Sequence, residues 1–323
     1  MASISDVAKR AGVSRSTVSL VCNNKGYVSQ ETREKILRVM EELNYTPSEL
    51  GRNLKKQHSN IVGIIIPDIA HPFFSTFIKY AEKSLYKHGY KTMVCGTAGR
   101  EDVEKAYLQM LERRTMDGVI MGAHSMEIEQ YLKISQPILT LDRYLSENIP
   151  TVRADKRQIA QLAAEQFVKK NRKKVVQLVS SHTIQNYDNE CDETFRSLLE
   201  AKGIQVMNIP IGYNVFTPEG YQKAAEQVFE RCPDVDGIFG VDMAAMACMK
   251  EAAKRGISIE SISIVAIDGT YITRAGEHTV TAVVQPIEEM AEKAVELILM
   301  MIESGGKPSM ETVFEVTLQA GDT

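Results

Sequence analysis

The sequence predicts a small all-α module at the N-terminus, followed by a much larger α/β region built on parallel sheets. Residues 3–47 carry three short helical patterns, whereas apolar strands alternate with helical segments from residue 60 onward. Residues 1–60 hold ten Lys/Arg and six Asp/Glu, a net charge of +4 in a chain whose total is −4, so the remainder carries −8. A basic head on an acidic body is typical of a polyanion-binding module joined to a different kind of domain.

The composition is that of a globular protein that works in a reducing compartment. Hydrophobic residues make up 44% and charged residues 25% of the 323 residues, enough for two or three compact domains. We see neither an apolar run of about 18–20 residues nor a secretory leader in the first residues. The five cysteines are dispersed, which predicts free thiols in the cytoplasm and neither disulfides nor a metal site.

The first helical pattern begins after Ser3, whose side chain can cap a helix. Apolar residues at positions 4, 7, 8 and 11 recur with the spacing of one buried helical face. Gly12 then supplies the left-handed backbone that a tight turn requires. We therefore expect the first helix to end at this glycine.

Ser14 can cap a second helix, which would turn Val18 and Val21 inward. Two short helices joined by a glycine turn are typical of a helix-turn-helix. Hydroxyl groups and an arginine at the N-terminal end of the second helix suit base edges and phosphates in the major groove. The outward-facing residues are Ser14, Arg15, Ser16, Ser19 and Leu20. An ordinary three-helix bundle is the alternative interpretation.

A third helix is expected after Ser29, its predicted cap. Its buried stripe would consist of Ile36, Leu37, Met40 and Leu43. The helix should end before Pro47, because the residue that precedes a proline is pushed out of helical geometry.

Residues 3–56 resemble the DNA-binding head of the lactose-repressor/galactose-repressor family of transcriptional regulators. The residues that carry the resemblance include Asp6-Val7-Ala8, Ala11-Gly12-Val13-Ser14, Thr17-Val18-Ser19, Asn23, Val28-Ser29, Thr32-Arg33-Glu34-Lys35, Leu43-Asn44-Tyr45 and Pro47. The resemblance implies a homodimer, with a tetramer as the alternative, that binds palindromic operator DNA through residues 1–47. It places Arg15, Ser16 and Leu20 at the positions that read bases. The positions that mostly contact phosphates would be Ser5, Ser14, Thr17, Asn23, Tyr27 and Thr32.

Residues 48–59 correspond to the hinge of this family, which becomes helical on the operator and enters the minor groove. The resemblance makes Leu54 the apolar wedge between base pairs and places Lys55 at the DNA beside it. Gly51 stands where relatives usually have alanine, and glycine costs a helix about 1 kcal/mol, so a looser hinge is expected. A simple flexible linker is the alternative.

From residue 60 onward, buried strands each end in polar residues. Asp68, Asp142-Arg143, Asp242 and Asp268 each follow an apolar segment such as NIVGIIIPDI or ISIVAIDG. The carboxyl ends of parallel strands are where such sheets bind ligands, and carboxylates beside aromatic rings make a natural sugar site. Each aspartate taken alone has an alternative role as a helix cap.

The family resemblance extends over this region through VGIIIPDIAHPFF, LDR, VRAD, GVDMAAMA, VAIDGTY and TAVVQP. The segments HPFF and IDGTY most resemble the sucrose-operon branch of the family. It implies two doubly wound parallel-sheet subdomains of periplasmic-binding-protein type, joined by three crossovers and containing the dimer interface. The first subdomain would hold residues 60–157 and 287–310, and the second 158–286 and 311–323. The residues that would line the effector cleft are Phe73, Phe74, Asp142, Arg143, Asp242 and Gln285.

This region departs from the family pattern at two further positions. Cys191 stands four residues before Phe195, where the family usually has an arginine that clamps the effector. Asp188 or Asn189 would then take over, or the effector is unusual or absent. Lys156 replaces the common asparagine after Asp155.

These features predict a cytoplasmic, sequence-specific DNA-binding regulator, a repressor by its resemblance, controlled by a small carbohydrate or sugar phosphate. The effector can act as inducer or corepressor. The alternative is a pleiotropic regulator controlled by a phosphoprotein or a nucleobase-type corepressor. A transport protein or an enzyme is disfavoured, since no glycine-rich cradle, metal cluster or nucleophile–base constellation is found. We expect no cofactor and no membrane partner.

Overall fold

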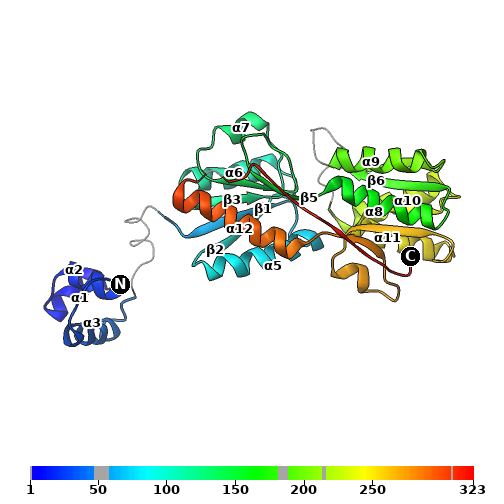
Figure 1. Ribbon diagram of the computed structural model, residues 1–323. Helices are drawn as coiled ribbons and strands as arrows, with labels where there is room; N and C mark the ends of the chain where they lie inside the picture. Colours follow the sequence, from blue (N-terminus) through cyan, green and yellow to red (C-terminus); the bar gives the residue numbers. More distant parts are fainter. Residues whose placement is uncertain (1, 47–57, 181–187, 213–215, 307) are drawn as a thin grey trace. The chain divides into compact units, whose positions relative to one another are not determined.

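The computed structural model describes the whole chain except residues 1, 47–57, 181–187, 213–215 and 307 (Figure 1). It forms two compact units, Met1–Ser59 and Asn60–Thr323. The predicted hinge residues Gly51, Leu54 and Lys55 lie outside the described residues. Within the described ranges, none of the helices combines the length and apolarity needed to cross a bilayer.

The first unit consists of three helices: α1 (Ile4–Ala11), α2 (Arg15–Cys22) and α3 (Gln30–Glu42). Each begins at the predicted serine, because the hydroxyl of Ser3, Ser14 or Ser29 accepts a hydrogen bond from a backbone N–H in the first turn. Gly12 ends α1 with φ of 65°, and its N–H donates to the carbonyls of the last turn. The predicted helix-turn-helix is therefore confirmed.

The core of this unit contains Val7, Ala8 and Ala11 from α1 together with Val18 and Val21 from α2. One expectation for α3 was wrong. Leu37 is 46% exposed, whereas Ile36 and Val39 are buried. Positions 36, 39, 40 and 43 lie on one face of a helix, and position 37 falls outside it.

The second unit begins with a six-stranded sheet in which every pair of neighbours is parallel. Its strands are β1 (Ile61–Ile66), β2 (Lys91–Gly96), β3 (Gly118–Met121), β4 (Ile138–Leu141), β5 (Thr151–Ala154) and β11 (Glu311–Phe314). Their order is β11-β5-β4-β3-β1-β2, so the direction of winding changes between β1 and β3.

Helices cover both faces of this first sheet. They are α5 (Pro72–Lys87), α6 (Glu101–Glu112), α7 (Ile128–Leu132) and α12 (Ile287–Ser304), and α5 and α12 lie side by side (Figure 1). Successive residues of β1 point to opposite faces: Ile64 and Ile66 pack with Phe77 of α5, whereas Ile65 packs with Leu108 of α6. This double coverage explains why β1 reads as a continuous apolar run.

The second six-stranded sheet has the order β12-β10-β9-β8-β6-β7. Its strands are β6 (Lys174–Ser180), β7 (Gln205–Ile211), β8 (Gly237–Val241), β9 (Ser263–Asp268), β10 (Thr281–Val284) and β12 (Thr317–Gln319). The pairs are parallel except that β12 runs antiparallel to β10. The surrounding helices are α8 (Lys156–Lys169), α9 (Asp188–Glu200), α10 (Pro218–Arg231), α11 (Asp242–Lys254) and the 3-10 helix η1 (Tyr271–Arg274). The predicted fold class is confirmed.

The chain passes between the two sheets three times, between β5 and α8, between β10 and α12, and between β11 and β12. The subdomain that holds the first sheet is called the N-lobe below, and the other the C-lobe. The predicted assignment of residues 311–323 to the C-lobe was wrong for β11. Glu311–Phe314 pairs with β5 of the N-lobe, and the last crossing follows at Glu315–Val316. A short exposed edge strand has no apolar signature that would reveal its partner.

We expect Gly12→Val to lower the free energy of unfolding of the head by about 1–2 kcal/mol, because a β-branched residue is strained in left-handed backbone. Space is not limiting, since a Cβ at this position would meet only Lys35 Nζ, at 3.9 Å. Gly12→Asn is the matched control, because asparagine tolerates this conformation. Thermal unfolding of the two variants should separate them, and equal midpoints would contradict the assignment of strain to the backbone.

Candidate functional site

A cavity lies at the carboxyl ends of the strands of both lobes. Phe73 and Phe74 at the start of α5 line it, together with Asp142 and Arg143 after β4 and Gln285 after β10. Sequence analysis predicted these five residues for the effector cleft, and the structure brings them together. Open parallel sheets bind ligands at this position, where the strand order reverses.

One wall of the cavity is aromatic and contains residues from both lobes. Phe74 of the N-lobe and Phe216, just before α10, pack edge to face at a centroid distance of 5.8 Å. His71 lies against both rings, at 5.5 Å from Phe74 and 5.3 Å from Phe216, and its ring is 6.3 Å from that of Tyr221. Such a wall can stack on the apolar face of a sugar ring.

His71 is only 5% exposed, and neither of its ring nitrogens has a hydrogen-bond partner. Burial lowers the pKa of this imidazole to about 4, against a weaker opposing effect of Asp68. The ring is therefore neutral at pH 7, with one donor and one acceptor nitrogen. Both ring nitrogens are therefore available for hydrogen bonds to a molecule in the cavity.

Two aspartates at strand ends adopt left-handed backbone, with φ of 54° at Asp142 and 91° at Asp268. Strained backbone of this kind costs about 1–3 kcal/mol and concentrates at functional sites. Both residues line the cavity. Asp142 Oδ2 lies 2.5 Å from Nζ of Lys156, the first residue of α8.

Asp268 is buried beside this pair, with 5% of its surface exposed. Its Oδ1 accepts a hydrogen bond of 2.7 Å from Gln285 Nε2, while Gln285 Oε1 is buried without a partner. Burial raises the pKa of Asp268 well above its usual range, and the neighbouring Asp242 raises it further. Lys156 opposes both effects. Sequence analysis noted Asp268 as a strand-end acid but did not include it among the effector residues.

The structure contradicts the placement of Asp242 in the cavity. Its carboxylate accepts hydrogen bonds from the Gly269 N–H at 3.1 Å, the Thr270 N–H at 2.6 Å and the Thr270 hydroxyl at 2.6 Å. Asp242 is 1% exposed and is not among the cavity-lining residues. It therefore holds the turn after Asp268 and contacts the site only through that turn.

The start of α9 contributes Cys191 and Asp192 to the cavity. Asp192 Oδ1 accepts a hydrogen bond of 2.7 Å from Gln177 Nε2. Phe195, which aligned the cysteine with the family's arginine, stacks on Phe239 in the core at 4.3 Å. Asp188 begins α9, and its side chain lies outside the described part. Sequence reasoning missed Asp192, although it follows Cys191 directly.

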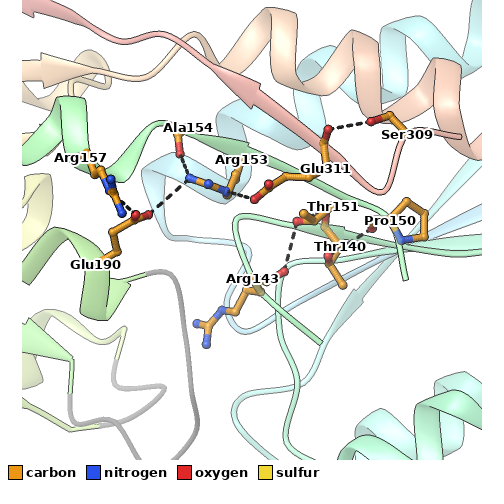
Figure 2. Close-up of polar contacts among 10 residues, drawn as sticks. All are labelled: Thr140, Arg143, Pro150, Thr151, Arg153, Ala154, Arg157, Glu190, Ser309 and Glu311. Atoms are coloured by element: carbon orange, nitrogen blue, oxygen red, sulfur yellow. Dashed lines mark hydrogen bonds and ion pairs between the residues drawn. The ribbon is translucent and has the colours of Figure 1, made fainter. Parts of the chain in front are cut away.

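Figure 2 shows ion pairs where the chain crosses between the lobes, and one of them joins β5 of the N-lobe to α9 of the C-lobe. Arg153 of β5 binds Glu311 of β11 at 2.6 Å and lies 4.0 Å from Glu190 of α9. Glu190 also binds Arg157 of α8 at 2.6 Å. In the same view the Thr151 hydroxyl donates to the backbone carbonyl of Arg143, whose side chain extends away from it.

The predicted DNA-contacting residues of the head differ in their exposure and in their hydrogen bonds within the head. Arg15, Ser16 and Ser5 are exposed, as are Leu20 at 37% and Tyr27 at 95%. The others form internal contacts. Ser14 caps α2, Thr17 shares that cap, the Asn23 side chain donates to the Ser19 carbonyl at 2.7 Å, and Thr32 bonds to Ser29.

Comparisons with known proteins cover most of the chain. The family model of bacterial regulatory proteins, lacI family, matches residues 3–48. The model of periplasmic binding proteins and sugar binding domain of LacI family matches residues 59–303. The chain is 34% identical to the sucrose operon repressor of Streptococcus mutans over 326 residues, covering 100% of this chain and 99% of the relative.

A ribose operon repressor of Halalkalibacterium halodurans is 33% identical, covering 94% of this chain and 91% of the relative. Among solved structures, the Lac repressor dimer bound to operator and the anti-inducer ONPF matches with a TM-score of 0.85 and 20% identity. That match covers 100% of this chain and 98% of the other. At this identity the likeness shows the fold alone.

Asp242→Ala should lower the free energy of unfolding by about 2–4 kcal/mol, because it leaves the buried N–H groups of Gly269 and Thr270 without acceptors. Asp242→Asn keeps one carbonyl oxygen and should cost less. Urea unfolding measures both. A loss below about 0.5 kcal/mol for the alanine variant would contradict the anchoring role.

His71→Gln should flatten the loss of stability at acid pH. As pH falls from about 6.5 towards 4, the unfolded chain protonates this histidine and the folded chain does not, so folding stability declines. The lowered pKa corresponds to at most about 3 kcal/mol across that window. Urea unfolding at a series of pH values tests this, with the surface variant His278→Gln as control. An unchanged slope would show that His71 is not buried in its neutral form.

Proposed function

The chain belongs to the LacI family of bacterial regulatory proteins, and we propose that it is an operator-binding repressor whose effector is a small carbohydrate. As a member of this family it is a DNA-binding transcriptional regulator and not an enzyme. One observation carries the proposal. A single chain joins a helix-turn-helix to a cavity lined by aromatic rings and strand-end carboxylates.

We propose that α2 enters the major groove and that Arg15, Ser16 and Leu20 read the bases. Their exposure at the N-terminal end and outer face of this helix supports the assignment. Ser5 and Tyr27 would meet phosphates on either side. Ser14, Thr17, Asn23 and Thr32 already bond within the head, so they would hold it in shape while offering their remaining hydrogen-bonding capacity to phosphates.

We further propose that residues 48–59 form the hinge, with Leu54 as the minor-groove wedge and Lys55 beside it. This assignment rests on the sequence resemblance, as these two residues lie outside the described part. The working form would be a homodimer on a palindromic operator, because a two-fold symmetric site requires two heads. A protein of this function acts in the cytoplasm, where the DNA is.

The effector is proposed to bind between the two lobes. Phe74 and Phe216 would stack on its ring, and Asp142 and Asp268 would accept hydrogen bonds from its hydroxyl groups. Because these residues come from different lobes, the ligand would bind one arrangement of the lobes better than another. That difference in affinity is what can shift the population of the DNA-binding state.

The magnitude required is attainable. Reversing a population from 1:99 to 99:1 needs about 5.5 kcal/mol of differential binding, which several charge-assisted hydrogen bonds can provide. The cavity offers carboxylates at Asp142 and Asp192 for such bonds, and the carboxyl group of Asp268 adds a further hydrogen-bonding group. The same residues serve an inducer or a corepressor, and only the sign of the coupling separates these roles.

A thermal-shift screen of the full chain tests the proposal. The panel contains sucrose, ribose, fructose and glucose with their phosphates, each with and without a DNA duplex that the chain has selected from randomised inverted repeats. We expect one sugar to stabilise the protein by about 2.7 kcal/mol at 100 times its Kd. The same sugar should change the affinity for the duplex, downward for an inducer and upward for a corepressor.

Arg15→Ala is the matched control for the head. It should weaken duplex binding and relax the base preference at symmetric positions, while the sugar response stays unchanged because Arg15 is exposed on α2. A chain that selects no sequence from the library would contradict the proposed operator binding. A sugar that binds without changing duplex affinity would contradict the proposed control.

A further inference from the structure

Resting on the proposed function, we infer that Lys156 decides the charge of the ligand. Its ammonium is a cation built into the cavity and paired with Asp142, so that the site accepts an uncharged polyol and rejects phosphorylated or amino-bearing sugars.

The position of Lys156 makes it part of the cavity. It follows Asp155, the N-cap of α8, and its side chain is 5% exposed although lysine is normally a surface residue. Nζ lies 2.5 Å from Asp142 Oδ2, and both residues line the cavity. Since α8 packs in the C-lobe and Asp142 follows β4 of the N-lobe, this ion pair connects the lobes inside the site.

The remaining charges leave no place for an anion. Two acids, Asp142 and Asp192, and two bases, Lys156 and Arg143, line the cavity, and the pKa of the third acid, Asp268, is raised well above its usual range. Lys156 is already paired, and Arg143 lies near the buried Glu104, where it opposes the rise in pKa that burial causes in that carboxyl. Cys191 adds no charge. A phosphate with a charge of about −1.5 to −2 would therefore have to displace the Asp142 carboxylate in order to bind Lys156.

A ligand that carries an ammonium group is excluded for the opposite reason. It would have to compete with Lys156 for the carboxylate of Asp142. An uncharged hydroxyl can share that carboxylate without breaking the ion pair, because a carboxylate accepts about four hydrogen bonds.

Groups outside this charge cluster independently indicate a neutral ligand. Both ring nitrogens of His71 and Oε1 of Gln285 lack partners, and these residues are 5% and 3% exposed. Both line the same cavity. A neutral imidazole donor, its acceptor nitrogen and an amide oxygen match hydroxyl groups, each of which donates and accepts.

The test compares two variants of the full chain. Asp142→Asn removes the carboxylate that binds the Lys156 ammonium, and Asp142→Asn with Lys156→Met removes the ammonium as well. Isothermal titration measures Kd for sucrose, ribose, fructose and glucose against their phosphates, and for glucosamine. Lys169→Met controls for the loss of an exposed lysine from the same helix. Thermal unfolding and duplex binding establish that each variant is folded.

We expect the wild type and Lys169→Met to bind a neutral sugar at least tenfold more tightly than its phosphate. Asp142→Asn should reduce this ratio at least tenfold, and the double variant should restore it. Glucosamine should bind the wild type at least tenfold more weakly than glucose whenever glucose binds. An unchanged ratio in Asp142→Asn, or the same reduced ratio in the double variant, would overturn the role of Lys156.

Two further outcomes separate this inference from the proposed function. A wild type that prefers the phosphorylated sugar overturns the inference and leaves the carbohydrate-controlled repressor intact. A wild type that binds neither member of any pair contradicts the proposed effector class, and the inference falls with it.

Discussion

The parallel arrangement of strands is the constraint on which the rest of the effector-binding unit depends. Parallel strands bring their carboxyl ends to one edge, and three crossovers between the two sheets let both edges contribute to one cavity. Asp142 and Asp268 belong to different sheets and are far apart in the chain, yet they face the same ion-paired lysine. Each carries left-handed backbone, a cost that the packed strand ends sustain.

Hydrogen bonding decides which of the strand-end aspartates stabilises the fold and which can bind a ligand. The carboxylate of Asp242 accepts three hydrogen bonds from the turn at Gly269 and Thr270, so it stabilises the fold and has little capacity left. Asp142 and Asp268 follow their strands in the same way but line the cavity. All three aspartates are mostly buried and follow apolar strands, so burial and position do not separate the structural acid from the other two. What separates them is the set of donors that each carboxyl group binds.

The structure also explains how a site without the family's arginine can be charge-balanced. Cys191 and Asp192 line the cavity from the start of α9, and Lys156 at the start of α8 adds an ammonium to it. The two departures noted in the sequence, at Cys191 and Lys156, thus concern one electrostatic environment. The ion pairs of Arg153 and Arg157 with acids of β11 and α9 hold the crossovers beside it.

The sequence by itself determined the helix-turn-helix and the alternation of strands and helices, because serine caps, the Gly12 turn and apolar periodicity act over a few residues. Through the family resemblance it also predicted that Phe73, Phe74, Asp142, Arg143 and Gln285 would lie together, and these five residues line one cavity. Only the tertiary structure decided that β11 pairs with β5 and that α3 buries Val39 and exposes Leu37. It also decided that Asp242 anchors a turn and that Lys156 forms an ion pair with Asp142. These depend on contacts between residues distant in the chain, and local pattern carries no information about which carboxylate a distant N–H or ammonium will reach.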